Sequence, residues 1–557
     1  MISERFAGAI MATLRERLAA RPGTDALIRE GARDVTVAEA LAEGPKGVPP
    51  SARVLLSIHD TGALARTLVA LDGGVEALLL ASYSFSPEVI DALAQAAGVT
   101  HIVTDRAELL AGSSADAAQE GPAGEGMDKG QGDVPQGSPL GTAPQATPAA
   151  EPHGAAGLAR AEAAAASHSG AGGKPQQPLS QQPFSQSGPQ AQAAPADRPG
   201  TITAAASRPV LTPAAVRGPA EGGAPVATTW LMTTSGTTGV PKIVTHSVAS
   251  LTRSVRGTRP EALPVWGLLY DMTRFAGMQV GLQAMTGHGT LAAIDRDAVL
   301  GDQVAEMAAA GVTHLSATPT LWRRLLMAPG VEGLPLRQIT LGGEIAEQPV
   351  LDAIRARFPK ARVTHIYAST EIGVGFAVND GRAGFPESYL SAEAPAGLAM
   401  RVEEGMLWLR PPEAHRTRYL GDNQLDMDAE GYVRTGDQVE IRPDTEGARV
   451  HFLGRDSGVV NVGGVKVYPE RVEAVLTADP RVSLAQVTAK SSPITGNLLV
   501  ATIVPADPAA DRAALKRELM AHAQAHLERE AVPAMWRFVD HLETNAAGKI
   551  VRSQAKA

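Results

Sequence analysis

The stretch from Thr228 to His246 reads TTWLMTTSGTTGVPKIVTH, and the rest of the chain is organised around it. Its first apolar residues, 229–232, predict the end of a buried strand. The loop that follows is built from Thr234, Ser235, Gly236, Thr237, Thr238, Gly239 and Lys242. Glycines let backbone amides approach an anion closely, and the lysine adds a point charge. The loop therefore has the chemistry of a polyphosphate site, although it does not fit the common P-loop pattern and a plain turn has a similar composition.

Composition narrows the class of protein. The chain has 557 residues, of which 44% are hydrophobic, so it can form more than one domain. Its net charge of -9 argues against broad binding to nucleic acid or anionic membranes. It contains no Cys, which excludes disulfides and fits a reducing compartment. Residues 1–23 predict an amphipathic surface helix rather than a signal peptide, and no apolar run could span a bilayer, so we expect a cytoplasmic protein without a membrane span.

Short apolar runs alternate with helical patterns on both sides of one unusual segment. Strands are predicted at 54–58, 100–104, 290–294, 313–316 and 338–341, and helices at 61–71, 87–97, 302–310, 320–327 and 348–358. This alternation predicts parallel sheets covered by helices. The segment 112–225 is rich in Ala, Gly, Pro, Gln and Ser, so we expect a disordered insertion there. After Gly454, a strand-rich part and a helix at 508–529 predict a small α+β domain.

Five further stretches carry chemically useful residues. They are Leu341–Ile345 (LGGEI), Ile366–Glu371 (IYASTE), Tyr432–Asp437 (YVRTGD), 454–470 with Gly-Arg-Asp at its start and NVGGVKVYPE at its end, and Asn545–Arg552 (NAAGKIVR). Tyr367 offers a flat ring for a base, and Thr370 a hydroxyl for phosphate. Glu371 offers a hard oxygen ligand for Mg²⁺, and Asp437 an acceptor for ribose hydroxyls. Each stretch taken alone is also explained as a turn or a solvated tail.

Taken in this order, the stretches resemble the adenylate-forming (AMP-binding) superfamily of acyl-CoA synthetases, amino-acid-activating adenylation domains and firefly luciferases. The resemblance covers nearly the whole chain except the insertion. It implies an α/β fold with a large N-terminal domain of helix-covered sheets and a small mobile α+β C-terminal domain. The N-terminal domain would comprise residues 1–111 and 226–453, with the ATP and acid site in the second part. Residues 112–225 would be the disordered low-complexity insertion. Residues 454–557 would form the C-terminal domain, which carries a catalytic lysine.

The resemblance also implies roles for particular residues. Residues 234–242 would hold the β- and γ-phosphates of ATP. Gly343, Glu344, Ile345 and Tyr367 would hold the adenine, and Asp437 the ribose, with Arg455 close by. Thr370 would contact the phosphate that becomes the acyl-AMP, and Glu371 would bind Mg²⁺. Lys549 would bridge the carboxylate and the α-phosphate during adenylation, so Lys549, Thr370 and Glu371 are the expected catalytic residues.

Three departures from the family pattern affect the interpretation. Ala368 stands where many relatives have Gly, and Ser457 stands at the expected hinge. On the acid side, the candidate residues are Tyr270, Asp271, Arg274 and Gly277. Arg274 occupies the place of a histidine common in CoA ligases. The pair Tyr270-Asp271 is similar to the Phe-Asp of amino-acid-activating domains, whose aspartate holds the substrate ammonium; the alternative is a structural Asp271–Arg274 pair at a helix start.

The function implied by the resemblance is an acid–thiol ligase. It would use ATP and Mg²⁺ to convert a carboxylic acid into an acyl-adenylate with release of pyrophosphate, and then transfer the acyl group to coenzyme A, as in fatty acid metabolism. One alternative is loading of an amino, aryl or fatty acid onto the phosphopantetheine of a carrier protein. Another is a non-catalytic nucleotide-binding scaffold, against which the intact charges of Lys242, Glu371, Asp437 and Lys549 count.

Overall fold

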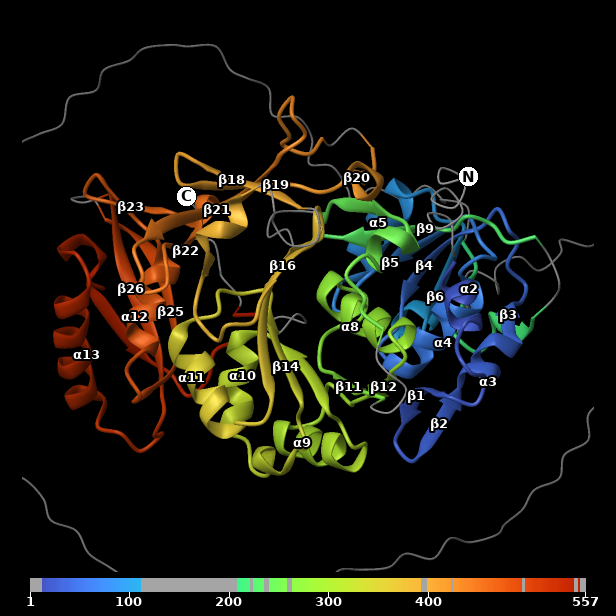
Figure 1. Cartoon of the computed structure of the whole chain (residues 1–557), viewed down its shortest axis with the longest axis horizontal. Helices are drawn as coiled ribbons and strands as arrows, with labels where there is room; N and C mark the ends of the chain where they lie inside the picture. Colours follow the sequence, from blue (N-terminus) through green and yellow to red (C-terminus); the bar gives the residue numbers. More distant parts are fainter. Residues whose placement is uncertain are drawn as a thin grey trace, which may run out of the picture. The chain divides into compact units, whose positions relative to one another are not determined.

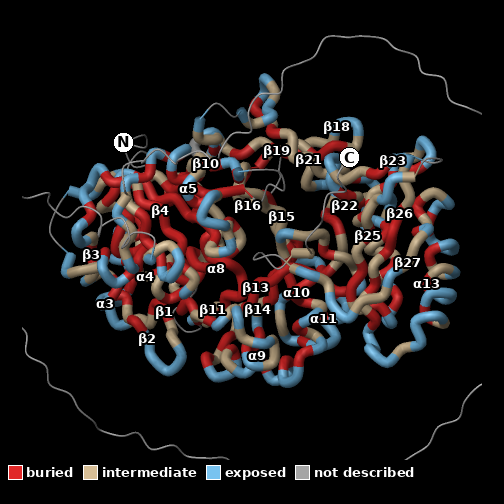
Figure 2. The backbone as a smooth tube through the Cα atoms, turned by 180° about the vertical axis from the view of Figure 1, so that it is seen from behind, coloured by how far each residue is buried: buried red, intermediate tan, exposed pale blue. Residues whose placement is uncertain are grey.

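The computed structural model describes residues 13–111, 208–220, 224–234, 240–257, 263–391, 398–421, 424–492, 496–544 and 549–550. In these ranges the strands gather into sheets that carry helices on their faces (Figure 1). Buried residues are concentrated in the strands, whereas outer helices such as α9 and α13 present many exposed residues (Figure 2). None of the helices described is long and apolar enough to cross a bilayer.

The first large sheet contains the strand that leads into residues 234–242, the phosphate loop, which the sequence predicts to bind phosphate. Its strands, in spatial order, are β20 (Arg418–Tyr419), β10 (Ile243–His246), β9 (Thr229–Thr233), β5 (Ala77–Leu80), β4 (Arg53–Ser57), β6 (His101–Thr104) and β7 (Val210–Leu211). Strands β9, β5, β4 and β6 are parallel, and β10 and β20 extend the sheet antiparallel. Leu56 packs in one core with α4 (Thr61–Leu71), and Leu55 in another with α5 (Pro87–Ala96). Because neighbouring strand residues face opposite ways, the two helices cover opposite faces.

The second large sheet is parallel in its interior. Its strands, in spatial order, are β16 (Gly373–Val378), β15 (Arg362–Ser369), β14 (Gln338–Gly342), β13 (His314–Ala317), β11 (Val265–Leu268), β12 (Thr290–Ala293), β1 (Ala26–Glu30) and β2 (Arg33–Thr36). The edge strands β16 and β2 run antiparallel to their neighbours. Helix α8 (Phe275–Thr286) shares one core with both large sheets. Helices α9 (Leu300–Ala309), α10 (Pro319–Leu326) and α11 (Gln348–Arg357) pack in a separate core on the other face.

A third sheet and the C-terminal domain complete the fold. The third sheet is antiparallel, with the order β17 (Phe385–Pro386), β22 (Arg449–Arg455), β21 (Val433–Arg442), β19 (Met406–Arg410) and β18 (Ala399–Glu403). The C-terminal domain contains β23 (Val460–Val462), β24 (Val465–Val467), α12 (Pro469–Thr477), β25 (Val482–Ser492), β26 (Gly496–Pro505), α13 (Arg512–His526) and β27 (Met535–Phe538). Its buried residues form their own core from Val460 onward. The chain is therefore a large N-terminal domain followed by a small α+β domain.

Short elements fill the connections. They are α2 (Leu14–Ala19), α3 (Val37–Ala42), β3 (Glu43–Pro45), β8 (Arg217–Pro219), α7 (Val248–Leu251), and the 3₁₀ turns η2 (Val331–Gly333), η3 (Glu387–Leu390), η5 (Glu413–His415), η6 (Asp456–Gly458) and η7 (Arg529–Ala531). Helix α2 falls within the predicted N-terminal helix, of which residues 1–12 lie outside the described residues. The expected hinge residue Ser457 lies in η6, between the third sheet and the C-terminal core.

The predicted insertion is wrong at its C-terminal end. Residues 208–220 are ordered: β7 pairs with β6, β8 pairs with β3, and Val216 is fully buried. These short strands are held by backbone hydrogen bonds to sheet edges, which composition does not reveal. Of the predicted insertion, residues 112–207 and 221–223 lie outside the described residues. The expectation of parallel sheets is confirmed for the sheet interiors, while the antiparallel edges and the antiparallel third sheet were not predicted.

Candidate active site

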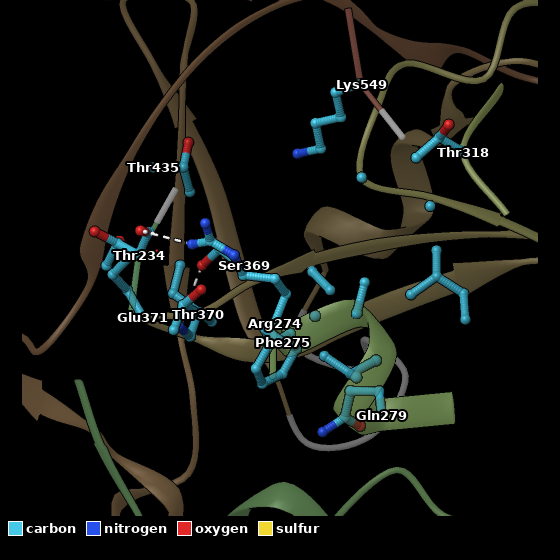
Figure 3. Close-up of a pocket in the computed structure, with 18 of the residues that line it drawn as sticks. Thr234, Arg274, Phe275, Gln279, Thr318, Ser369, Thr370, Glu371, Thr435 and Lys549 are labelled. Carbon is cyan, nitrogen blue, oxygen red and sulfur yellow. Dashed lines mark hydrogen bonds between the residues drawn. The ribbon is translucent and has the colours of Figure 1, made fainter. Parts of the chain in front are cut away.

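A large cavity of about 1970 Å³ brings the sequence motifs together. Its walls come from the phosphate-loop strands, the ends of β14 and β15, helix α8 and the C-terminal domain. Lys549 reaches it from the C-terminal segment, on the side of the pocket away from Phe275 and Gln279 (Figure 3). Because the strands β13, β14 and β15 are parallel, their carboxyl ends present their loops at one edge of the sheet, where ligands commonly bind.

The phosphate loop connects two antiparallel strands, β9 and β10. Thr233 pairs with Ile243, and the Thr234 amide donates to the Lys242 carbonyl at 2.9 Å. The two ends of the loop are therefore fixed side by side. The intervening residues Ser235, Gly236, Thr237, Thr238 and Gly239 lie outside the described residues. The predicted strand before the loop is confirmed as β9.

Lys242 and Glu371 are linked through a residue that the sequence did not single out, Tyr419. The Lys242 Nζ lies 5.0 Å from the centre of the Tyr419 ring, and the Tyr419 hydroxyl donates to Glu371 Oε1 at 3.2 Å. Tyr419 arrives there because β20 pairs with β10, with Val244 opposite Tyr419. No local pattern marks this pairing in the sequence.

The carboxylate of Glu371 suits a magnesium ion. Mg²⁺ in nucleotide enzymes usually binds one or two carboxylates and the substrate's phosphates, keeping several waters. Glu371 and Thr370 follow the last residue of β15, Ser369, and all three line the cavity (Figure 3). The described residues contain no group of three or more His, Cys, Asp or Glu arranged to hold a metal. A Mg²⁺ ion here would take Glu371 as one ligand and its other ligands from bound phosphates and water.

Two of the residues expected around the adenine, Gly343 and Glu344, have neighbours outside that group. Gly343 adopts a φ of +82°, which favours glycine, and a Cβ there would lie 3.1 Å from Lys549 Cε, a tight contact at the end of a flexible side chain. Glu344 accepts a hydrogen bond from the Thr320 amide at 2.9 Å, and Ile345 is half-buried on the same loop.

The ring of Tyr367 has aromatic neighbours of its own. It stacks on Phe376 and Phe452, with centroids 5.4 Å away in both cases and ring planes within 10°. The structure thus places Tyr367 in an aromatic stack beside the third sheet. An adenine base could therefore contact only the part of the Tyr367 ring that Phe376 and Phe452 do not cover.

Asp437 lies in a polar pair opposite Arg455. The two residues face each other across β21 and β22, and Arg455 Nε lies 2.8 Å from Asp437 Oδ1. The Tyr367 hydroxyl donates to the other carboxylate oxygen. Burial raises the pKa of Asp437, while the charge of Arg455 opposes this rise. The expected closeness of Asp437 and Arg455 is observed.

Lys549 is positioned among charges of both signs. Burial lowers the pKa of its ammonium, Glu344 and Asp437 favour the charged form, and Arg455 and Arg274 disfavour it. The side chain lies against the Gly343 loop, as its distance from Gly343 shows.

Of the four acid-side candidates, Asp271 has other partners. It is fully buried and accepts hydrogen bonds from Ser82 Oγ at 2.6 Å and from the Thr273 amide and hydroxyl. Its ion-pair partner is Arg296, at 3.6 Å, and not Arg274 as the sequence alternative expected. Asp271 therefore belongs to the framework that joins the two large sheets.

The other three candidates shape the start of α8. Arg274 is the N-cap residue, lies 4.5 Å over the Phe85 ring and donates to the Thr234 carbonyl at 3.3 Å. Tyr270 is buried at the cavity wall, where burial raises the pKa of its hydroxyl. A side chain on Gly277 would collide with the carbonyl oxygen of Asp271, so Gly277 lets α8 pack closely. Arg274 and Tyr270 line the cavity.

Comparison with known proteins identifies the class to which this fold and site belong. A family model described as "AMP-binding enzyme" matches residues 36–404, and one described as "AMP-binding enzyme C-terminal domain" matches residues 471–549. The first match covers more than half of the chain. The chain belongs to the AMP-binding enzyme family, within the adenylate-forming superfamily.

Individual relatives show how broad this family is. The chain is 29% identical over 326 residues to the probable nonribosomal peptide synthetase CymA of Salinispora arenicola, covering 54% of this chain but only 4% of that protein. It is 26% identical over 346 residues to the 2-succinylbenzoate–CoA ligase of Bacillus subtilis, covering 59% of this chain and 69% of the relative. The fold is similar to o-succinylbenzoate CoA synthetase from Bacillus subtilis in complex with an acyl-adenylate, with a TM-score of 0.63, 19% identity, and coverage of 98% and 97%.

Proposed function

We propose that this chain is an ATP- and Mg²⁺-dependent acid–thiol ligase. It joins a carboxylic acid to AMP with release of pyrophosphate and then transfers the acyl group to coenzyme A. The observation that carries the proposal is the meeting of Lys549, from the C-terminal segment, with the Gly343 loop in one cavity with Lys242 and Thr370. The relatives named as CoA ligases support the same reaction.

The residue chemistry suits attack of a carboxylate on the α-phosphorus of ATP. Two anions must approach each other, so fixed cations and donors have to neutralise the charge that develops. Lys549 supplies an ammonium that both anions can share, and the Thr370 hydroxyl donates to the phosphate. Lys242 neutralises the departing pyrophosphate. Mg²⁺ at Glu371 would add charge neutralisation on the phosphates.

The first experiment measures ATP–pyrophosphate exchange with a panel of carboxylic acids. Wild-type protein is expected to give acid-dependent exchange, and Lys549→Ala is expected to lose it while still binding ATP. Lys516→Ala is the control, since Lys516 is an exposed lysine on α13. Equal exchange in wild type and Lys549→Ala would contradict the role of Lys549. No exchange with any acid would contradict the reaction.

A second candidate function differs only in the acceptor. Relatives such as CymA are peptide synthetases, which favours loading onto the phosphopantetheine of a carrier protein as the alternative to coenzyme A. The acid that supports exchange is incubated with ATP and either coenzyme A or a holo-carrier protein, and thioester formation is measured. Thioester only on the carrier would replace the coenzyme A proposal.

A further inference from the structure

One charged side chain in the cavity wall has no part in the reaction described above. Arg253 follows α7 and lines the cavity beside β16. It is half-buried, and its Nη2 donates to the backbone carbonyl of Val374. Its Nη1 has no hydrogen-bond partner among the described residues, while the residue as a whole keeps part of its surface exposed at the cavity. Among the described residues, no carboxylate forms an ion pair with Arg253.

A desolvated guanidinium without an anion is unfavourable. Buried charges are normally paired, because burial removes hydration that only a counter-charge and hydrogen bonds replace. Burial alone accounts for the lowered pKa of Arg253. Its charge also acts on His415, a side chain that is itself positive when protonated. The described part of the chain therefore leaves this cation without a counter-ion.

The loop that carries Arg253 is fixed rather than free to turn away. Two glutamines one turn apart on α8 hold it: Ser254 Oγ donates to Gln279 Oε1 at 3.2 Å, and Gln283 exchanges hydrogen bonds with the Arg256 backbone at 2.9 and 3.1 Å. The side-chain amides of Gln279 and Gln283 are therefore engaged with this loop. Arg253 is thus held at the cavity wall before a ligand arrives, which reduces the ordering cost of binding.

The position of Arg253 suits the far end of a short acid. Val374, which accepts its hydrogen bond, pairs with Ala368 on β15. Thr370 lies one residue beyond the end of β15 and two residues after Ala368, so their Cα atoms are at most roughly 7 Å apart. We infer that the acid substrate carries a second carboxylate, which Arg253 binds while the first is activated beside Thr370. This inference rests on the proposed function.

Matched acids separate this inference from a purely structural role of Arg253. Exchange is measured with linear dicarboxylic acids of about three to eight carbons and with one aromatic dicarboxylic acid, each beside its half-amide and a monocarboxylic acid of equal length. A hydrogen bond to a charged group corresponds to about 10- to 100-fold in kcat/KM, so the preferred diacid should exceed its half-amide by that factor.

Variants then assign the preference to one side chain. Arg253→Met should abolish the preference for the diacid, mainly through KM, and leave the half-amide unchanged, while Arg253→Lys should keep part of it. Arg324→Met, at an exposed arginine on α10, is the control and should behave as wild type. Thermal melting shows whether each variant folds; if Arg253→Met does not fold, the wild-type comparison of diacid and half-amide decides alone.

The contrary outcomes are distinguishable. Exchange with monocarboxylic acids or half-amides as good as with diacids would overturn the inference and leave the proposed function standing. An equal loss for all acids in folded Arg253→Met would make Arg253 a structural residue that holds Val374. Absence of exchange with every acid would overturn the proposed function and the inference together.

Discussion

Removal of the Tyr419 hydroxyl tests the link between the phosphate loop and the expected magnesium ligand. In the structure this hydroxyl donates to Glu371 Oε1 at 3.2 Å, while the Tyr419 ring lies 5.0 Å from Lys242 Nζ. Tyr419→Phe keeps the ring, and with it the contact with Lys242. It removes the hydrogen bond that this oxygen of Glu371 accepts from the described part of the chain.

The size of the effect follows from the geometry. A hydrogen bond to a charged group contributes about 1.5–3 kcal/mol, and the 3.2 Å length at a half-buried site favours the lower end. About 1.4 kcal/mol corresponds to a tenfold change, which agrees with the usual effect of losing a residue that orients a metal ligand. We expect the Mg²⁺ concentration for half-maximal exchange to rise about tenfold. Tyr419→Leu should add a further loss of about 0.5–1 kcal/mol by removing the contact between the lysine and the ring.

The assay is ATP–pyrophosphate exchange as a function of free Mg²⁺ at saturating acid. Tyr432→Phe is the matched control, because the Tyr432 ring packs under Arg401 and Arg410. An unchanged Mg²⁺ dependence in folded Tyr419→Phe would show that Glu371 does not need this donor to bind Mg²⁺. A tenfold shift in the control would show that the effect is not specific to Tyr419.

Two further predictions concern buried carboxylates. Burial raises the pKa of Asp72 from 3.8 to about 6, although Trp230 Nε1 and the Leu14 amide donate to it. The folded state thus binds this proton more tightly than the unfolded state, so the stability due to Asp72 is present below pH 4 and decreases by about 3 kcal/mol as pH rises past 6. The melting-temperature gap between wild type and Asp72→Asn should therefore narrow from pH 4.5 to pH 8, and a constant gap would contradict the raised pKa. Asp271→Ala should lower the free energy of unfolding in urea by about 3 kcal/mol, because Arg296 loses its partner. The same substitution should reduce kcat/KM equally for amino acids and other acids. A loss confined to amino acids would instead support binding of the substrate ammonium by Asp271.

Much of the local structure could be predicted from the sequence. The helix predicted at 61–71 is α4, with the same bounds, and the strands predicted around 100–104 and 338–341 are β6 and β14. Apolar spacing reports these elements directly, because one face of each is buried. The prediction of disorder at residues 208–220 is wrong because apolar spacing does not report the elements there. Strands β7 and β8 have only two and three residues, which is too short for a periodic pattern.

The candidate site was predictable in its chemical groups but not in their partners. Lys242, Glu371 and Lys549 were identified from their motifs, and all three line one cavity. Tyr419 was missed because it touches Glu371 across 48 residues of chain through the pairing of β20. Arg253 was missed because an arginine after a short helix carries no signal in the sequence; its partial burial and the lack of a counter-ion among the described residues appear only in the fold.

The residue pattern alone is sufficient for the available side chains, their order along the chain, several of the longer helices and strands, and the family. Only the tertiary structure decided that Asp271 binds Ser82, 189 residues away, and Arg296, instead of the neighbouring Arg274. It also decided that the Tyr367 ring stacks with Phe376 and Phe452. The physical reason is that periodicity and capping act within a few residues, whereas these contacts depend on strand order and on how helices cross between sheets.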